Sequence, residues 1–348
     1  MQRQYAVMLV LLTLVAVGGA GVSAAESGKI VVAVTMPYLA HVVEAVGGSQ
    51  VRVVELIPPG VDAHDYEPPY SDLIKELRSA DLIVMTGPSH LALESRIKEL
   101  RESGVFTATI IDYEEYVRFG LTLLKNPRTG LVNPHGYFFS YSGLEAIAKA
   151  VAAALAGIDP SKQQYFMSRA DAFVDLLEAY RSTLTSQLSH QRVALVSPIL
   201  QYVAKDLELN VTYVLLPDPS VQPTQADLGR LKSLVTTGEV TTVLMTDVEV
   251  SKNPKLVDEL RNLGVNPVIV SLTRHVDAPE LIPSALAQSL QTLNAGTCGG
   301  PEGFQLGTSL LLGGILAEAI VIAGLVILLF KWRRAVIEAI CKGFEVGE

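Results

Sequence analysis

The sequence predicts an α/β protein of two similar lobes, each a parallel sheet flanked by helices, which one long helix joins. Two separate stretches, residues 29–112 and 192–293, alternate short β-branched runs with helical patterns. Strict alternation of this kind is typical of parallel sheets wound right-handedly. Between these stretches lies a helical pattern of about 30 residues that proline and glycine do not interrupt. An apolar run of 25 residues at 306–330 adds a C-terminal transmembrane helix.

The first lobe begins with the run KIVVAVT at residues 29–35, which is typical of a buried parallel strand. The helix after it is bounded by Met36-Pro37 and by Gly47-Gly48. The four strands are expected at residues 29–35, 51–57, 81–86 and 106–112. The helices are expected at residues 38–46, 72–80 and 91–102. Residues 113–133 follow without a regular pattern and are expected to be irregular.

A helical segment is expected to join the two lobes. An alanine-rich helix is predicted at residues 142–156. Asp159 and Pro160 then form the pattern of an N-cap followed by proline at the first helical position. The long helix that starts there would extend about 45 Å over about 30 residues, enough to run alongside both lobes.

The second lobe repeats the alternation of the first. Its strands are expected at residues 192–196, 211–215, 240–246 and 266–272. Its helices are expected at residues 199–207, 225–235, 253–263 and 279–293. A loop is expected at residues 217–223, where three prolines occur.

Both ends of the chain carry targeting patterns. A basic residue, an apolar run and the small residues Val22-Ser23-Ala24 predict a cleaved secretory signal peptide, with an uncleaved anchor as the alternative. The apolar run at 306–330 is long enough to span a bilayer. The residues KWRR directly after it predict a cytoplasmic tail. The protein is therefore expected in the cell membrane as a single-pass protein with its ectodomain outside.

These patterns divide the chain into seven parts. They are a signal peptide at 1–25, a first lobe at 28–141, a helical linker at 142–190, a second lobe at 191–295, a tether at 296–305, the transmembrane helix at 306–330 and the cytoplasmic tail at 331–348. The formal net charge is −9, and the lysines and arginines do not cluster before the KWRR segment. This balance argues against a nucleic-acid partner.

A candidate metal ligand, His64, follows the second strand of the first lobe. It lies in the stretch GVDAHDYEPPYSDL at residues 60–73, between two proline pairs. Ligands bind at the carboxyl ends of strands in open α/β sheets, and a neutral imidazole is a common ligand of transition metals. A loop histidine bonded only to backbone groups is the alternative interpretation.

The stretch around His64 resembles the first ligand loop of the substrate-binding proteins of zinc and manganese ABC importers, known as cluster A-I. A second stretch, Asn133-Pro134-His135-Gly136-Tyr137-Phe138, is similar to that family's Asp-Pro-His-x-Trp motif. The resemblance covers residues 29–293 in the order of elements. It implies two lobes joined by a long helix, with His64 and His135 as ligands of Zn²⁺ or Mn²⁺. A C-terminal membrane anchor indicates an archaeal-type variant, where no outer membrane retains soluble receptors.

The second lobe departs from the family pattern. The position of the family's third ligand holds Ser197, and the region of its fourth, an aspartate, reads Val270-Ser271-Leu272-Thr273. His90 directly follows the third strand and could complete a set of three histidines; a residue at the helix N-terminus facing water is its alternative. His275 could reach the site from the second lobe. Asp247 and Glu249, which follow the strand at 240–246, are further substitutes.

The sequence therefore predicts an extracytoplasmic binding protein, not an enzyme. It would capture a divalent metal between its lobes and deliver it to the permease and ATPase of an ABC importer. The first alternative is a binding or adhesion protein of this fold that has lost metal binding, and the loss of both second-lobe ligands is its evidence. The remote alternative is a zinc-dependent hydrolase. The sequence has no His-Glu-x-x-His motif, glycine-flanked nucleophilic serine or Walker-type phosphate loop.

Overall fold

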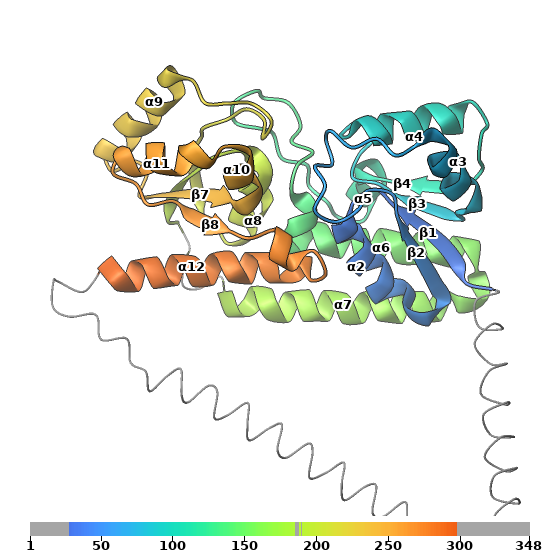
Figure 1. Cartoon of the computed structure of the whole chain (residues 1–348). Coiled ribbons are helices and arrows are strands. Elements are labelled where there is room, and N and C mark those ends of the chain that lie inside the picture. The colour runs from blue at the N-terminus through green and yellow to red at the C-terminus, as the bar shows by residue number, and fades with distance from the viewer. Residues whose placement is uncertain (1–27, 185–187, 189, 298–348) are drawn as a thin grey trace, which may run out of the picture. The chain divides into compact units, whose positions relative to one another are not determined.

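The computed structural model describes residues 28–184, 188 and 190–297, and in them two four-stranded parallel sheets (Figure 1). In the first lobe the strand order is β2-β1-β3-β4. In the second lobe it is β6-β5-β7-β8, the same order relative to the chain. The strands are β1 (Ile30–Val34), β2 (Val51–Glu55), β3 (Leu82–Val84), β4 (Thr109–Ile111), β5 (Arg192–Leu195), β6 (Asn210–Val214), β7 (Thr242–Thr246) and β8 (Val268–Val270). The predicted α/β class with two similar lobes is confirmed.

Helices cover both faces of each sheet. Those of the first lobe are α2 (Pro37–Gly47), α3 (Tyr70–Ser79), α4 (Ala92–Glu102) and α5 (Tyr113–Arg118). The linking helices are α6 (Tyr141–Ile158) and α7 (Gln163–Leu184). Those of the second lobe are α8 (Gln201–Asp206), α9 (Gln225–Thr236), α10 (Asp247–Lys252), α11 (Pro254–Asn262) and α12 (Ile282–Thr297). Each predicted strand and each predicted helix between strands has its counterpart within a few residues.

One hydrophobic core runs beneath both sheets. It includes Val34 of β1, Ile147 of α6, Phe173 of α7, Leu195 of β5 and Leu286 of α12. Figure 1 shows α6, α7 and α12 on this side of the two sheets. A separate smaller core lies on the opposite face of each sheet. The two lobes therefore pack on one shared layer of helices, α6, α7 and α12. The loops at the strand ends of the two lobes face one another.

The long linking helix is shorter than predicted where the structure describes it. A 3₁₀ turn, η3 (Pro160–Lys162), follows the N-cap Asp159, and α7 then spans 22 residues to Leu184. The predicted continuation through residues 185–187 and 189 lies outside the described residues. Helix α7 packs against α6 and α2, and its Phe173 and Leu177 belong to the core that both lobes share.

Two short helices were not predicted. Helix α5 lies in the segment expected to be irregular, and its N-cap Asp112 accepts a hydrogen bond from the Glu114 backbone N–H. Helix α10 begins with a capping box of Thr246 and Glu249. Each has six residues, fewer than two turns, so neither shows a helical period in the sequence.

The predicted signal peptide, transmembrane helix and cytoplasmic tail lie outside the described residues. Of the predicted tether, residues 296 and 297 belong to α12, and the rest lies outside them too. In the part of the chain that the structure describes, α6 is the one helix with the length and apolarity of a membrane span, and 56% of that window is buried inside the protein.

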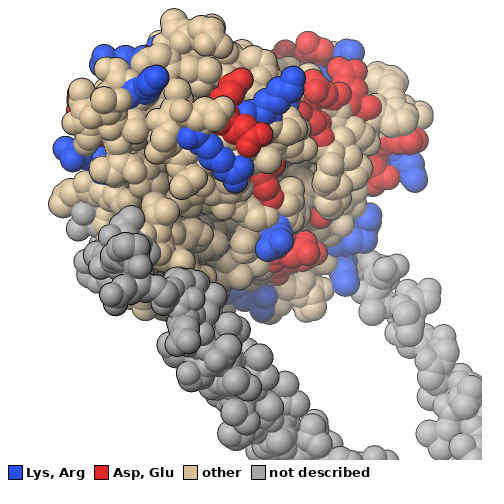
Figure 2. Space-filling model, turned by 60° about the vertical axis from the view of Figure 1, so that its left-hand side comes forward, with Lys and Arg blue, Asp and Glu red and all other residues tan. Residues whose placement is uncertain are grey.

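Charges of both signs are mixed over the face that Figure 2 shows. Among the described residues, two ion pairs of lysine or arginine cross between the lobes. Arg128 pairs with Asp227 of α9 at 2.8 Å, and Lys252 of α10 pairs with Asp62 of the first lobe, also at 2.8 Å. Each of these two pairs joins a segment of the first lobe to the second.

Candidate metal site

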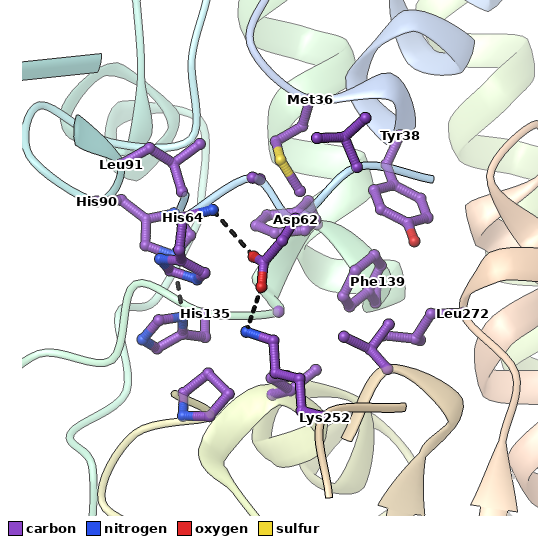
Figure 3. Close-up of a pocket in the computed structure, with 17 residues that line it drawn as sticks. Met36, Tyr38, Asp62, His64, His90, Leu91, His135, Phe139, Lys252 and Leu272 are labelled. Carbon is purple, nitrogen blue, oxygen red and sulfur yellow. Dashed lines mark hydrogen bonds and ion pairs between the residues drawn. The ribbon is translucent and has the colours of Figure 1, made fainter. Parts of the chain in front are cut away.

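Three histidines from different loops of the first lobe meet at one point (Figure 3). His64 follows β2, His90 lies between β3 and α4, and His135 precedes the 3₁₀ turn η2 (Tyr137–Phe139). Each offers a ring nitrogen, and these nitrogens lie within 4.8 Å of one another. Nε2 of His90 lies 2.9 Å from Nδ1 of His135. Since nitrogen ligands of a tetrahedral zinc ion are about 3.4 Å apart, this group fits one ion after small side-chain movements.

The structure brings together His64, His90 and His135 of the predicted ligands, but not His275. His275 belongs to η6 (Thr273–His275) in the second lobe, and its Nδ1 lies 2.6 Å from the carbonyl oxygen of Ser271. It is not part of the three-histidine group. His90 does not take the alternative position facing water, because its ring packs against those of His64 and His135.

The loop of His64 is held by Asp62. The Asp62 carboxylate accepts a hydrogen bond from the backbone N–H of His64 at 3.1 Å and lies 2.8 Å from Nζ of Lys252. Figure 3 shows both contacts beside the histidines. Asp62 therefore fixes the local turn and at the same time ties the loop to the second lobe.

The loop of His135 is held mainly by Asn133. The Asn133 side chain accepts from the backbone N–H of His135 at 2.9 Å and donates to the Pro198 carbonyl at 3.0 Å. Tyr202 of α8 donates to the Asn133 carbonyl at 2.7 Å. Gly136 has a left-handed backbone (φ 78°), and a Cβ there would overlap the carbonyl oxygen of Ile199. His135 is thus positioned by a close approach of the two lobes that glycine permits.

His90 is held through Thr86 by a buried glutamate. Nδ1 of His90 lies 2.7 Å from Oγ1 of Thr86. That hydroxyl donates to Glu94 at 2.8 Å, and the Thr86 backbone N–H donates to the same carboxylate at 2.6 Å. Burial raises the pKa of Glu94 to about 7, and hydrogen bonds from Thr35 and Thr86 oppose that rise.

Asp218 is the carboxylate that the second lobe brings to the site, and the sequence analysis missed it. Its Oδ2 lies 3.4 Å from Nε2 of His135. The hydrogen bond from His135 holds the pKa of Asp218 well below its usual range. The available signal was its place in the predicted loop at 217–223, directly after a strand, because the carboxyl ends of parallel strands share one edge.

The other second-lobe carboxylates considered as ligands, Asp247 and Glu249, make their hydrogen bonds within the second lobe. The Asp247 carboxylate accepts from the Ser271 hydroxyl at 2.6 Å and from the Leu272 backbone N–H at 2.8 Å. Burial raises the pKa of Glu249, and hydrogen bonds from the backbone N–H and the hydroxyl of Thr246 oppose the rise. Ser197, at the position of the family's third ligand, is buried and caps its own turn, because its hydroxyl accepts from the backbone N–H of Ile199 at 3.4 Å.

The histidines border a cavity of about 130 Å³. Met36, Phe138 and Phe139 of the first lobe and Val248 and Leu272 of the second line its apolar part. Burial, with the charges of His135 and Lys252, lowers the pKa of His64. Burial, with the charges of His135 and His64, lowers that of His90 further. Both rings therefore stay neutral, the form that binds metals, at a pH where exposed histidines are protonated.

Comparisons with known proteins identify the family of the chain. Residues 32–295 match the model of a protein family described as the periplasmic component A of a zinc-uptake complex. The iron-binding protein YfeA of Yersinia pestis is 27% identical over 197 residues, which are 53% of this chain and 59% of that protein. The zinc-binding protein TroA of Treponema pallidum is 29% identical over 181 residues, 50% of this chain and 55% of that protein. The chain thus spans little more than half the length of these relatives.

Solved structures share the fold over most of the described residues. The SBP FpvC of Pseudomonas aeruginosa in complex with Ni²⁺ has a TM-score of 0.64 at 22% identity, covering 76% of this chain and 98% of that one. A zinc-bound deletion mutant of ZnuA has a TM-score of 0.60 at 22% identity, covering 75% and 96%. At this identity the likeness establishes the architecture of two lobes.

Proposed function

The chain belongs to the zinc-uptake complex component A family, and we propose that it captures a divalent transition metal at His64, His90 and His135 for delivery to an ABC importer. The observation that carries this proposal is the three-histidine group, whose nitrogens lie within 4.8 Å of one another. The three side chains come from loops that are far apart in the sequence. Packing of the backbone alone does not require their rings to meet. The loss of metal binding, suggested by Ser197, is therefore not the favoured interpretation.

Zinc is the metal that this site suits best. Three imidazole nitrogens with a carboxylate nearby are typical of zinc, whereas manganese prefers more oxygen ligands. The carboxylate nearby, Asp218, lies against His135 on the ring nitrogen that faces away from His90. Asp218 of the second lobe would thus orient His135, a ligand from the first lobe.

The expected location of the protein follows from the sequence. An ectodomain outside the cell, tethered by the apolar helix at 306–330, would keep the captured ion next to a permease in the same membrane. The ATPase of the importer would be a separate chain. Protease added to intact cells should release a fragment that ends near residues 298–305, and protection of the ectodomain would contradict this topology.

The experiment that tests metal capture is analysis of the full-length protein purified without chelator. We expect about one zinc per chain by elemental analysis, and a higher melting temperature with added zinc, because a ligand of the folded state adds about 2.7 kcal/mol at a hundredfold excess over Kd. Replacement of His64 or His135 by alanine should remove most of that rise. If no first-row divalent ion is bound or shifts the melting temperature, the proposed function is wrong.

A further inference from the structure

We propose that Glu94, acting through Thr86, is a positioning residue that fixes the ring tautomer of His90 so that its Nε2 lone pair faces the bound ion. This inference rests on the proposed function, because it concerns how one ligand of the same site is prepared. Among the described residues, Glu94 makes no hydrogen bond to His64, His90 or His135. Its influence passes through the Thr86 hydroxyl.

The Glu94 carboxylate is surrounded by hydrogen-bond donors. It is completely buried and accepts from the Thr35 hydroxyl at 2.6 Å, from the Thr86 backbone N–H at 2.6 Å and from the Thr86 hydroxyl at 2.8 Å. At pH 8, above its raised pKa, Glu94 is ionised, and an ionised carboxylate only accepts. The single hydrogen of the Thr86 hydroxyl is therefore committed to Glu94.

The commitment of that hydrogen decides the tautomer of His90. Oγ1 of Thr86 lies 2.7 Å from Nδ1 of His90 and has no second hydrogen to donate, so it must accept one from Nδ1. A neutral imidazole carries one N–H, which leaves Nε2 as the nitrogen with the lone pair. Nε2 is also the atom that lies 2.9 Å from His135. The buried bonds thus direct the metal-binding nitrogen toward the other ligands.

His135 is prepared in the same way from the second lobe. Its Nε2 lies 3.4 Å from the Asp218 carboxylate, which can only accept, so the carboxylate favours a hydrogen on Nε2 and leaves Nδ1 facing His90. Nε2 of His90 and Nδ1 of His135 lie 2.9 Å apart, a hydrogen-bond distance, so a hydrogen lies between them in the metal-free protein. A metal cation would take the place of that hydrogen. Outer carboxylates that orient metal-binding histidines in this way strengthen metal binding.

The second lobe contains the same arrangement without a histidine. Thr246 donates its hydroxyl to buried Glu249 at 2.9 Å, and its backbone N–H donates to the same carboxylate at 2.6 Å. There the Thr246 hydroxyl oxygen accepts from the Glu249 backbone N–H at 3.2 Å. In the first lobe the corresponding hydroxyl oxygen, that of Thr86, accepts from Nδ1 of His90 instead. A threonine and a glutamate can therefore serve the fold alone, and Thr246 provides an internal control for Thr86.

The test compares Thr86→Val with Thr246→Val in the full-length protein, with zinc affinity measured by competition with a chelating dye at pH 8. Each variant loses one buried hydroxyl, and both should lose similar stability. Thr86→Val should weaken zinc binding by about 10- to 100-fold, the usual effect of removing an outer partner, while Thr246→Val leaves it within a few fold of wild type. Thr86→Ser, which keeps the hydroxyl, should restore most of the affinity.

A second measurement does not depend on any variant folding. In the metal-free wild-type protein labelled with ¹⁵N-histidine, the His90 ring should show the shifts of the Nδ1–H tautomer at pH 8. The Nε2–H tautomer, or equal zinc affinities in the two valine variants, would overturn the inference. Failure of the wild type to bind zinc would instead overturn the proposed function, so the two failures are distinguishable.

Discussion

The ammonium group of Lys252 lies 2.8 Å from the carboxylate of Asp62, and this ion pair joins the loop of His64 to helix α10 of the other lobe. The two side chains are 25% and 33% exposed. Solvent therefore weakens their attraction, and the contribution to stability is expected to stay below about 1 kcal/mol. The ion pair is important because it holds the loop that carries His64.

We expect a double-mutant cycle of Asp62→Asn and Lys252→Met to give a coupling below about 1 kcal/mol in denaturant unfolding, and less at high salt. Zinc affinity should fall about two- to fivefold in either single variant, because the His64 loop loses its tie to α10. The Arg128–Asp227 pair also joins the lobes and is the matched control. Breaking the Arg128–Asp227 pair should lower stability about as much as breaking the Asp62–Lys252 pair, but it should leave zinc affinity unchanged. Equal losses of zinc affinity for both pairs would contradict the role given to Asp62.

His275 should be dispensable for metal binding. Its Nδ1 is engaged with the Ser271 carbonyl, and it is not part of the three-histidine group. We expect His275→Ala to keep the zinc-dependent rise in melting temperature, whereas His90→Ala should lose most of it. Loss of the rise in His275→Ala would show that the second lobe supplies a ligand after rearrangement.

Asp218 should affect zinc affinity in a graded way. Asp218→Asn keeps an oxygen that can accept from Nε2 of His135 but loses the charge, and Asp218→Ala loses both. We expect Asp218→Ala to weaken zinc binding by about 10- to 100-fold and Asp218→Asn by less. The matched control is Asp258→Ala in α11, whose exposed carboxylate pairs with Arg261 on the same helix. If Asp218→Ala binds zinc as wild type does, the second lobe does not support His135.

Gly136→Ala should be more destabilising than Gly130→Ala. Both glycines have a left-handed backbone, with φ of 78° and 71°. An alanine at 130 would meet nothing within 4 Å, but at 136 its Cβ would overlap the Ile199 carbonyl. We expect losses of about 1 kcal/mol at 130 and about 2 kcal/mol or more at 136, measured by denaturant unfolding, together with weaker zinc binding only at 136. Equal losses at the two positions would mean that the lobes do not approach this closely.

His41 should make a contribution to stability that depends on pH. The close carboxylate of Glu280, 3.1 Å away in the second lobe, raises the pKa of His41, and burial opposes that rise. The folded protein therefore holds this proton more tightly than the unfolded chain, and the contribution is complete below about pH 6.5. It should disappear as the pH rises through the raised pKa. The difference in unfolding free energy between wild type and His41→Gln should shrink from pH 6 to pH 8.5; a constant difference would mean that His41 stays neutral.

The sequence was sufficient to place the first-lobe histidines. His64 and His90 each follow a strand, and the carboxyl ends of parallel strands meet at one edge. His135 came from the resemblance of its motif. That the three rings would meet depends on the approach of Gly136 to Ile199, which no local pattern encodes.

The second lobe was harder to predict because its polar residues serve distant partners. Asp247 holds residues 271–273, a contact that only the folded chain creates, and Ser197 caps its own turn. Asp218 was overlooked because carboxylates were sought after the third and last strands of the second lobe and not after its second strand. The assignment of the chain ends to a signal peptide, tether and membrane helix stays a prediction.

The origin of all three rings in one lobe has a consequence for how cargo leaves. For an ion held by His64, His90 and His135, moving the second lobe away withdraws Asp218 but breaks no bond to the ion. Opening alone would therefore leave the cargo bound. Hand-over would require groups of the receiving permease to replace the imidazoles one after another, so its rate would depend on ligand exchange rather than on a hinge.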